Sequence, residues 1–413
     1  MSDRPDQAAG KSIETRVAVF GFAILVLGAI LWAYRSPLTE KTDFSVTYIG
    51  AYMVHHGRGA ELYDVAEQDK LKAHLIPNAE PIIYEHPPFE ALLLSPLGGL
   101  PYRTAYLIWG LLNGALWLLL PWILRPYAKA PREDLGYLAL WLIFAPLGIA
   151  LYQGQSSLVL LALFMATFVA FKQGRDFRAG LWLGLGLFKF QFVLPFALIL
   201  FLLRKWKFMQ GFSLMAALLA ILSVAAVGVQ GVVGYFTLLS KIVRHPANSK
   251  LGSATDMATL NGFVHAVLGD SFGAIANVAI VGVLSLSLVL FIVWRWVRSG
   301  DRGEYFDLMF AASIAGSLVM GFHMFTHDLS PLLLAMLLVM AQIPRDRPLA
   351  LRVALWATLI LLWTPPIYIA LVASHRMFLL FPVLIVFFAA TMQLASQSIP
   401  VMHAGRLETH VAD

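Results

Sequence analysis

Long runs of apolar residues, separated by short polar stretches, recur along the whole chain. Many of these runs approach or exceed the roughly 20 residues that a helix needs to cross the hydrocarbon core of a bilayer. A membrane β-barrel would show short alternating segments instead. The pattern therefore predicts an all-α polytopic membrane protein. The predicted spans, about twelve in all, are 16–34, 102–124, 135–151, 156–171, 179–189, 191–203, 208–229, 273–294, 305–323, 328–342, 350–366 and 377–395.

The apolar stretch 179–203 contains two polar residues near its middle, Lys189 and Gln191. As a single span it would move the basic cluster at residues 204–207 to the other side of the membrane and invert every later segment. We divide it at residues 189–191, into halves of about 11–13 residues, too short for ordinary spans. The division predicts a hairpin that turns within the membrane or near its outer face.

Basic residues concentrate at one side of this predicted topology. Short cytoplasmic loops are enriched in Lys and Arg, and the predicted inner segments hold 19 of the 30 Lys and Arg residues. The distribution places both ends in the cytoplasm, as tails 1–15 and 396–413 around a single domain, 16–395. Two long loops, 35–101 and 230–272, then lie outside.

The composition agrees with a membrane protein. Hydrophobic residues make up 59% of the chain, charged residues 13%, and the mean hydropathy is +0.74. A soluble domain carries about 25% charged residues. The net charge of +6 comes from small clusters between apolar runs, which argues against a nucleic-acid partner. Because the chain has no cysteine, disulfides and thiolate metal sites are excluded.

The longest polar insertion, residues 38–89, gathers acids, histidines and aromatic residues between the first two apolar runs. Asp43 lies just after the first run, where a carboxylate suits a general base that takes a proton from an attacking hydroxyl. The same residue precedes a predicted helix, Phe44–His55, and is also typical of a helix N-cap. The aromatic residues of that helix recur near helical spacing, which predicts a helix lying in the membrane interface.

The insertion ends in the sequence Tyr84-Glu85-His86-Pro87-Pro88-Phe89. Two consecutive prolines fix the backbone and end any preceding helix, so this segment has a structural role. We also consider Tyr84 and His86 as substrate contacts, because both lie close to the predicted membrane surface.

Lys189 lies within a predicted apolar hairpin, where a lysine is costly and by default indicates a functional site. We interpret it as a cation for a lipid phosphate, with Gln191 as a hydrogen-bond donor beside it. The alternative is a lysine whose ammonium group reaches back to the interface. Gln155, in the neighbouring predicted turn, either caps a helix end or contacts the same ligand.

Other polar residues fall in the remaining predicted outer segments. Arg244 belongs to a small basic cluster that suits phosphate binding or a solvated loop. His323 and His327 are four residues apart, which predicts one helix face, but no third ligand completes a metal motif. We therefore predict neither metal nor cofactor, and interpret His327 with Asp328 as a polar pair lining an outward cavity.

In order and spacing, these residues resemble glycosyltransferase family 87, a group of GT-C enzymes that includes mycobacterial α-mannosyltransferases. The resemblance covers roughly residues 16–340 and departs from the family in three places. In the second outer loop, Met257-Ala258-Thr259-Leu260-Asn261-Gly262 keeps only part of the Asn-x-Ser-Leu-x-Gly pattern that members often have. Glu85 and His86 separate Tyr84 from Pro87 where members often have Tyr-Pro-Pro, and Phe190 replaces the proline of a Lys-Pro-Gln-like hairpin. The residues that carry it are Asp43-Phe44, Gly57, Leu62-Tyr63-Asp64, Tyr84, Pro87-Pro88-Phe89, Pro96, Leu100-Pro101, Gly154-Gln155-Ser156, Ala179-Gly180, Gly184, Lys189-Phe190-Gln191 and His327-Asp328-Leu329.

The resemblance implies a GT-C fold and an inverting transfer of a hexosyl, first of all mannosyl, group. The donor would be a polyprenyl-phosphate sugar, the acceptor a lipid or glycan, and the site would face the exterior of a bacterial plasma membrane. Asp43 matches the family's general base, the lipid phosphate leaves, and no nucleotide or essential metal takes part. The residues do not distinguish mannose from glucose, galactose or arabinose.

Two other classes of membrane protein remain as alternatives. A transporter or lipid flippase usually shows paired repeats and charges in several mid-membrane segments, whereas the charges here gather at one face. A non-catalytic protein that assembles the cell envelope would have no need of Asp43. The glycosyltransferase interpretation requires that Asp43, Lys189 and His327 share one cavity.

Overall fold

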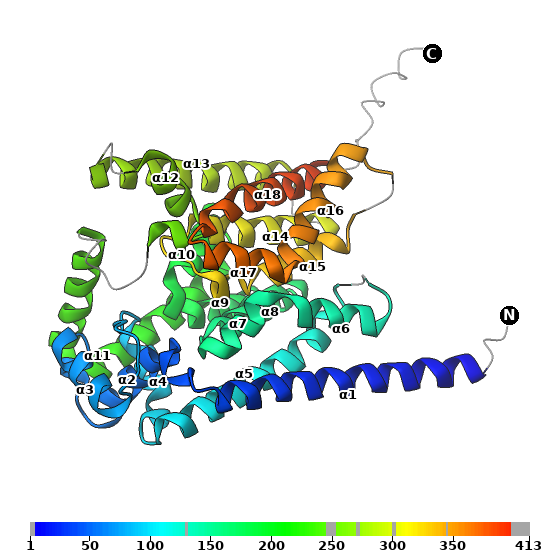
Figure 1. Cartoon of the computed structure of the whole chain (residues 1–413). Helices are drawn as coiled ribbons and strands as arrows, with labels where there is room; N and C mark the ends of the chain where they lie inside the picture. Colours follow the sequence, from blue (N-terminus) through cyan, green and yellow to red (C-terminus); the bar gives the residue numbers. More distant parts are fainter. Residues whose placement is uncertain are drawn as a thin grey trace, which may run out of the picture.

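The computed structural model describes residues 5–128, 131–244, 253–269, 273–299, 303–343 and 346–397, and no strand occurs among them. Figure 1 shows an elongated bundle with α1 along one side and the short helices α2, α3 and α4 grouped at one end. The α-helices are α1 (Pro5–Arg35), α2 (Phe44–His55), α3 (Val65–Leu75), α4 (Pro88–Gly98), α5 (Tyr102–Leu124), α6 (Asp134–Ile143), α7 (Ala145–Gln153), α8 (Ser157–Lys172), α9 (Asp176–Leu185), α10 (Phe190–Leu202), α11 (Trp206–Arg244), α12 (Leu260–Leu268), α13 (Gly273–Ser299), α14 (Gly303–Met320), α15 (Leu332–Met340), α16 (Leu349–Trp363), α17 (Pro365–Ala373) and α18 (Leu380–Gln397). The 3-10 helices are η1 (Thr39–Lys41), η2 (Gly59–Glu61), η3 (Gly186–Lys189), η5 (Ala254–Asp256), η6 (Thr326–Leu329) and η7 (Met377–Leu379).

Every predicted span overlaps one or more of these helices, and α5 has the predicted bounds. By length and composition, six helical stretches of the described residues can cross a membrane, or eight if two bent pairs count as one span each. The bent pairs are α6 with α7, at 53°, and α16 with α17, at 65°. The chain is therefore a polytopic α-helical membrane protein. The count of twelve spans stays a prediction.

Helices α9 and α10 are joined by η3 into one uninterrupted helical stretch, but this stretch is bent and not straight. Gly180 of α9 packs on the start of α11, so closely that a Cβ there would lie 2.0 Å from the Phe208 carbonyl oxygen. In a straight helix, Leu202 would lie roughly 33 Å beyond Gly180. The six residue steps from Leu202 to Phe208 can span only about 20 Å. The stretch is therefore bent between Gly180 and Leu202, and the hairpin at Lys189 stays a prediction.

The polar insertion folds into α2, α3 and α4 at the end of the bundle that we call the site end. Helix α2 has the predicted bounds, Phe44–His55, but it packs inside the protein and does not present its aromatic face at the surface. Its residues from Phe44 to Ala51 are all buried, and the Tyr48 hydroxyl donates a hydrogen bond to the Leu100 carbonyl at 2.8 Å. Contacts with α4 and α5 cover the aromatic residues that the spacing assigned to the interface.

The two histidines predicted on one helix face do not share a helix. Helix α14 ends at Met320 and η6 begins at Thr326, so His323 precedes the 3-10 turn that carries His327. A helical spacing of four residues therefore does not apply to this pair. Both His327 and Asp328 of η6 line the cavity described below.

Candidate active site

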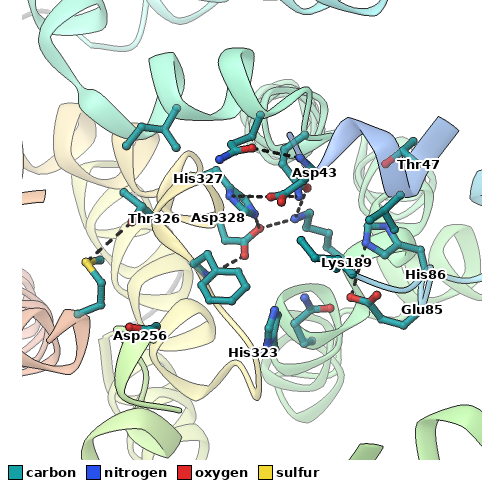
Figure 2. Close-up of a pocket in the computed structure, with 18 of the residues that line it drawn as sticks. Asp43, Thr47, Glu85, His86, Lys189, Asp256, His323, Thr326, His327 and Asp328 are labelled. Atoms are coloured by element: carbon teal, nitrogen blue, oxygen red, sulfur yellow. Dashed lines mark hydrogen bonds and ion pairs between the residues drawn. The ribbon is translucent and has the colours of Figure 1, made fainter. Parts of the chain in front are cut away.

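A cavity of about 1180 Å³ lies at the site end, between the folded insertion and the helices of the bundle. Seven of the nine residues predicted to form the site contribute to its wall. Figure 2 shows several of them facing one another around the opening. The seven are Asp43, His86, Gln155, Lys189, Gln191, His327 and Asp328.

Asp43 stands at the N-cap position of α2, but its side chain makes no capping hydrogen bond. Its Oδ2 instead accepts a hydrogen bond from Nε2 of Gln155 at 2.8 Å and lies 3.9 Å from Nδ1 of His327. The side chain is 24% exposed, so a substrate in the cavity can reach it. Of the two interpretations of Asp43, this geometry favours a functional carboxylate over a helix cap.

A turn at residues 153–155 holds Asp43 from two directions. The Asp43 N–H donates to Oε1 of Gln153 at 3.1 Å, while Gln155 contacts the carboxylate. Between them Gly154 adopts a φ of +65°, and a Cβ there would lie 2.6 Å from Cβ of Phe44. Glycine is required because the left-handed backbone disfavours any side chain and because α2 leaves no room for one.

Gly154→Ala is expected to reduce both stability and the transfer activity that the family resemblance implies. The left-handed backbone costs roughly 1–2 kcal/mol with a Cβ, and the clash pushes the turn away from Asp43. Gly174→Ala is the matched control, since Gly174 has a φ of +69° but nothing within 4 Å of the added Cβ. Thermal unfolding and transfer are measured for both variants in detergent. Equal transfer by the two variants would contradict the role given to this turn.

Lys189 forms a buried ion pair with Asp328, and the two residues are 4% and 1% exposed. The Lys189 ammonium group also donates to Oε1 of Gln155 at 3.3 Å. Oδ2 of Asp328 accepts the Phe325 N–H at 2.9 Å, and its Oδ1 lies 3.4 Å from Nε2 of His327. Lys189 therefore lies at the cavity wall with its ammonium group held by Asp328 and Gln155.

These contacts join the predicted residues into a closed ring. It runs from Asp43 through Gln155, Lys189, Asp328 and His327 back to Asp43. The ring brings together four segments that are far apart in sequence: the start of α2, the turn before α8, η3 and η6. Figure 2 shows Asp43 facing both Lys189 and His327.

His86 on the cavity wall pairs with Glu90, a buried residue of α4. Nδ1 of His86 contacts Oε2 of Glu90, and Oε1 of Glu90 accepts the Ser156 hydroxyl at 3.0 Å. Burial lowers the pKa of the His86 imidazole, but the charge and hydrogen bond of Glu90 outweigh it and raise the pKa to about 9. His86 therefore carries a positive charge at neutral pH.

This pair predicts a pH-dependent contribution to stability. The pKa of His86 is about 9 in the folded state, against about 6.5 for an unfolded chain. The stabilisation is fully present below the unfolded value and is lost as the pH rises through about 9. The thermal midpoints of wild type and His86→Gln are expected to converge between pH 6 and pH 10, roughly the range spanned by these values. A constant difference across that range would contradict this assignment.

Tyr84 does not contribute to the cavity wall. Tyr84 is 1% exposed, packs its ring on Gly50, and donates its hydroxyl to the Pro87 carbonyl at 3.3 Å. It positions the loop before α4, and we correct its interpretation as a substrate contact. Arg244 ends α11, and its side chain lies outside the described part of the structure.

Sequence reasoning missed some polar groups that line the cavity or contact its wall. Glu90 lies in the first turn of α4, after the two prolines. The only sign of it in the sequence is that an acidic residue follows the predicted start of a helix. Asp256 of η5 and His375 after α17 meet at 3.0 Å, and both line the cavity. They are 119 residues apart, and no motif connects them.

The family model of glycosyltransferase family 87 matches residues 84–321 of this chain. Comparisons with curated proteins and with solved structures gave no match. The matched region covers more than half of the 413 residues and includes the segments that carry His86, Gln155 and Lys189. This chain belongs to glycosyltransferase family 87 and is a membrane glycosyltransferase.

Proposed function

We propose that the enzyme moves a hexosyl group, first of all mannosyl, from a polyprenyl-phosphate sugar to a lipid or glycan acceptor, with inversion at the anomeric carbon. The observation that carries this proposal is the common cavity of Asp43 and Lys189, which are joined through Gln155. A carboxylate can act as the base at the acceptor, and a cation can stabilise the leaving phosphate. The two groups therefore match the two ends of such a displacement. Asp43 and Asp328 lie outside the region that the family model covers, so their roles rest on this geometry.

The reaction requires a base at the acceptor and a cation at the leaving group. A carboxylate oxygen of Asp43 takes the proton of the acceptor hydroxyl as its oxygen forms a bond to the anomeric carbon. The bond from that carbon to the phosphate oxygen breaks, and its electron pair stays on the phosphate. The leaving polyprenyl phosphate thereby gains one negative charge, which Lys189 and His86 are placed to stabilise.

The size and the wall of the cavity suit a lipid-linked donor. Its volume of about 1180 Å³ exceeds the roughly 300–1,000 Å³ of an ordinary small-molecule pocket. Apolar side chains from α17, among them Ile369 and Val372, line one part of it. Because these two are 68% and 48% exposed, they connect the cavity with the apolar outer surface. A prenyl chain can follow this path while its phosphate meets Lys189.

We further propose a GT-C arrangement of about twelve spans, with the site end outside a bacterial plasma membrane and both termini in the cytoplasm. The basic residues around the turn between α8 and α9, and those before α11, lie at the other end of the bundle from Asp43. Ring contact between Phe171 and Phe208, at 5.6 Å, brings these two basic segments together. The positive-inside rule then favours a cytoplasmic location for them.

A donor panel tests the substrate class. Membranes that contain the enzyme are incubated with radiolabelled polyprenyl-phosphate mannose, and then with the glucose, galactose and arabinose counterparts. The expected result is transfer of label from at least one lipid-phosphate sugar, dependent on the enzyme. Transfer from nucleotide sugars alone would contradict the proposal.

A further inference from the structure

Among the described residues, Gln155 is the side chain that hydrogen-bonds both Asp43 and Lys189. Its Nε2 donates to Asp43 Oδ2 at 2.8 Å, and its Oε1 accepts from Lys189 at 3.3 Å. An ammonium group only donates and a carboxylate only accepts. The two partners therefore fix the orientation of the amide, with its oxygen toward Lys189 and its nitrogen toward Asp43.

We propose that Gln155 is a positioning residue that sets the separation and orientation of the base and the phosphate-binding cation. The inference rests on the proposed function and replaces the sequence-based interpretation of Gln155 as a substrate contact. Both ends of its amide are already hydrogen-bonded to protein. In this proposal Asp43 contacts the acceptor, and Gln155 holds Asp43 in place.

The separation that Gln155 imposes fits an in-line displacement. An amide with a hydrogen bond at each end places the outer atoms roughly 6–8 Å apart, given the usual lengths of such bonds. In a reactive arrangement, the base lies about 3 Å from the nucleophile, which lies about 3–3.5 Å from the anomeric carbon. The bond from the anomeric carbon to the leaving oxygen lengthens this path further. From the base to the leaving oxygen the path is then roughly 8 Å long, about the separation that Gln155 sets, so Lys189 would contact the phosphate beside this line and not beyond its far end.

The backbone around Gln155 is held tightly enough for this role. Its N–H donates to the Ala150 carbonyl at 2.9 Å, and the neighbouring Gly154 carbonyl accepts from the Trp109 indole at 2.8 Å. Helix α5 therefore anchors the turn from behind, while Gln153 binds the backbone of Asp43 in front. A side chain on a rigid turn holds its partners in a constant geometry.

Gln155→Leu keeps the size of the side chain and removes both hydrogen bonds. Since a misplacement of about 1 Å can cost 10²-fold, kcat is expected to fall roughly 10–100-fold, with the donor KM within about threefold of wild type. Gln173→Leu, an exposed position at the far end of α8, is the matched control and is expected to behave as wild type. A raised donor KM with unchanged kcat would overturn the inference and restore Gln155 as a substrate contact.

Gln155→Glu gives a second readout that a purely structural residue would not produce. The new carboxylate still accepts from Lys189 but faces the Asp43 carboxylate, and two adjacent carboxylates share protons at higher pH than one alone. The acid limb of the kcat profile is expected to move to higher pH. An unmoved limb would overturn the inference, including in the case where Gln155→Leu fails to fold.

Asp43→Asn, assayed in the same preparations, separates this inference from the proposed function. If Asp43→Asn is inactive while Gln155→Leu matches wild type, only the positioning role fails. If Asp43→Asn retains the wild-type kcat, the proposed base itself is wrong, and the positioning role falls with it.

Discussion

Replacing Asp43 by Asn is expected to lower sugar transfer roughly 10²–10⁴-fold, the usual contribution of a general base, while donor binding stays within about threefold. Asn preserves the shape of the side chain, and its oxygen can still accept the hydrogen bond that Gln155 donates to Asp43. It has no carboxylate to take the acceptor proton. Single-turnover transfer and retention of labelled donor by the purified enzyme measure the two quantities separately.

Asp64→Asn is the control for this variant, because it makes the same substitution within the same insertion. Asp64 caps α3 by accepting from the N–H groups of Ala66 and Glu67, and Asn caps helices about as well as Asp. It is expected to leave transfer unchanged. A loss of similar size in both variants would point to a damaged insertion and not to a missing base.

Replacing Lys189 by Met is expected to reduce both stability and donor binding. The change leaves the Asp328 carboxylate buried, at 1% exposure, without its cation. Breaking a buried ion pair in this way costs roughly 3–5 kcal/mol. Loss of a charged hydrogen bond to phosphate would weaken donor binding by roughly 10–100-fold. Thermal unfolding and donor retention are measured on the purified protein.

The double variant Lys189→Met with Asp328→Asn separates the two effects. It removes both charges, and Asn still accepts from the Phe325 N–H that now contacts Asp328. Much of the lost stability is expected to return, but donor binding is not. Lys70→Met, on the exposed side of α3, serves as the control substitution. A double variant that binds donor as wild type does would remove Lys189 from the phosphate site.

The helices were largely predictable from the sequence, because apolar runs bounded by polar or basic residues define where a membrane helix begins and ends. Helix α5 matches its predicted bounds, whereas the hairpin at Lys189 stays a prediction from the positions of the basic clusters. Asp43, Lys189 and His327 also share one cavity, as the enzyme interpretation required. A carboxylate after the first span and a lysine inside an apolar run are strong signals because both are costly away from a function.

The remaining features depend on tertiary contacts that no local pattern encodes. Burial of α2 follows from its packing against α4, and the same aromatic spacing would suit an interfacial helix. Tyr84 differs from His86 only in the direction of its side chain, which places one in the core and the other at the cavity. The pairing of Asp256 with His375 joins two distant loops.

The stereochemistry of the product tests the central claim most directly. Purified wild-type enzyme is given a polyprenyl-phosphate sugar of known anomeric configuration and an acceptor that supports transfer, and the configuration of the new glycosidic bond is determined by NMR. A single displacement assisted by Asp43 predicts inversion, with release of polyprenyl phosphate and no such product from Asp43→Asn. A product with retained configuration, or an inverted product formed equally by Asp43→Asn, would contradict the account.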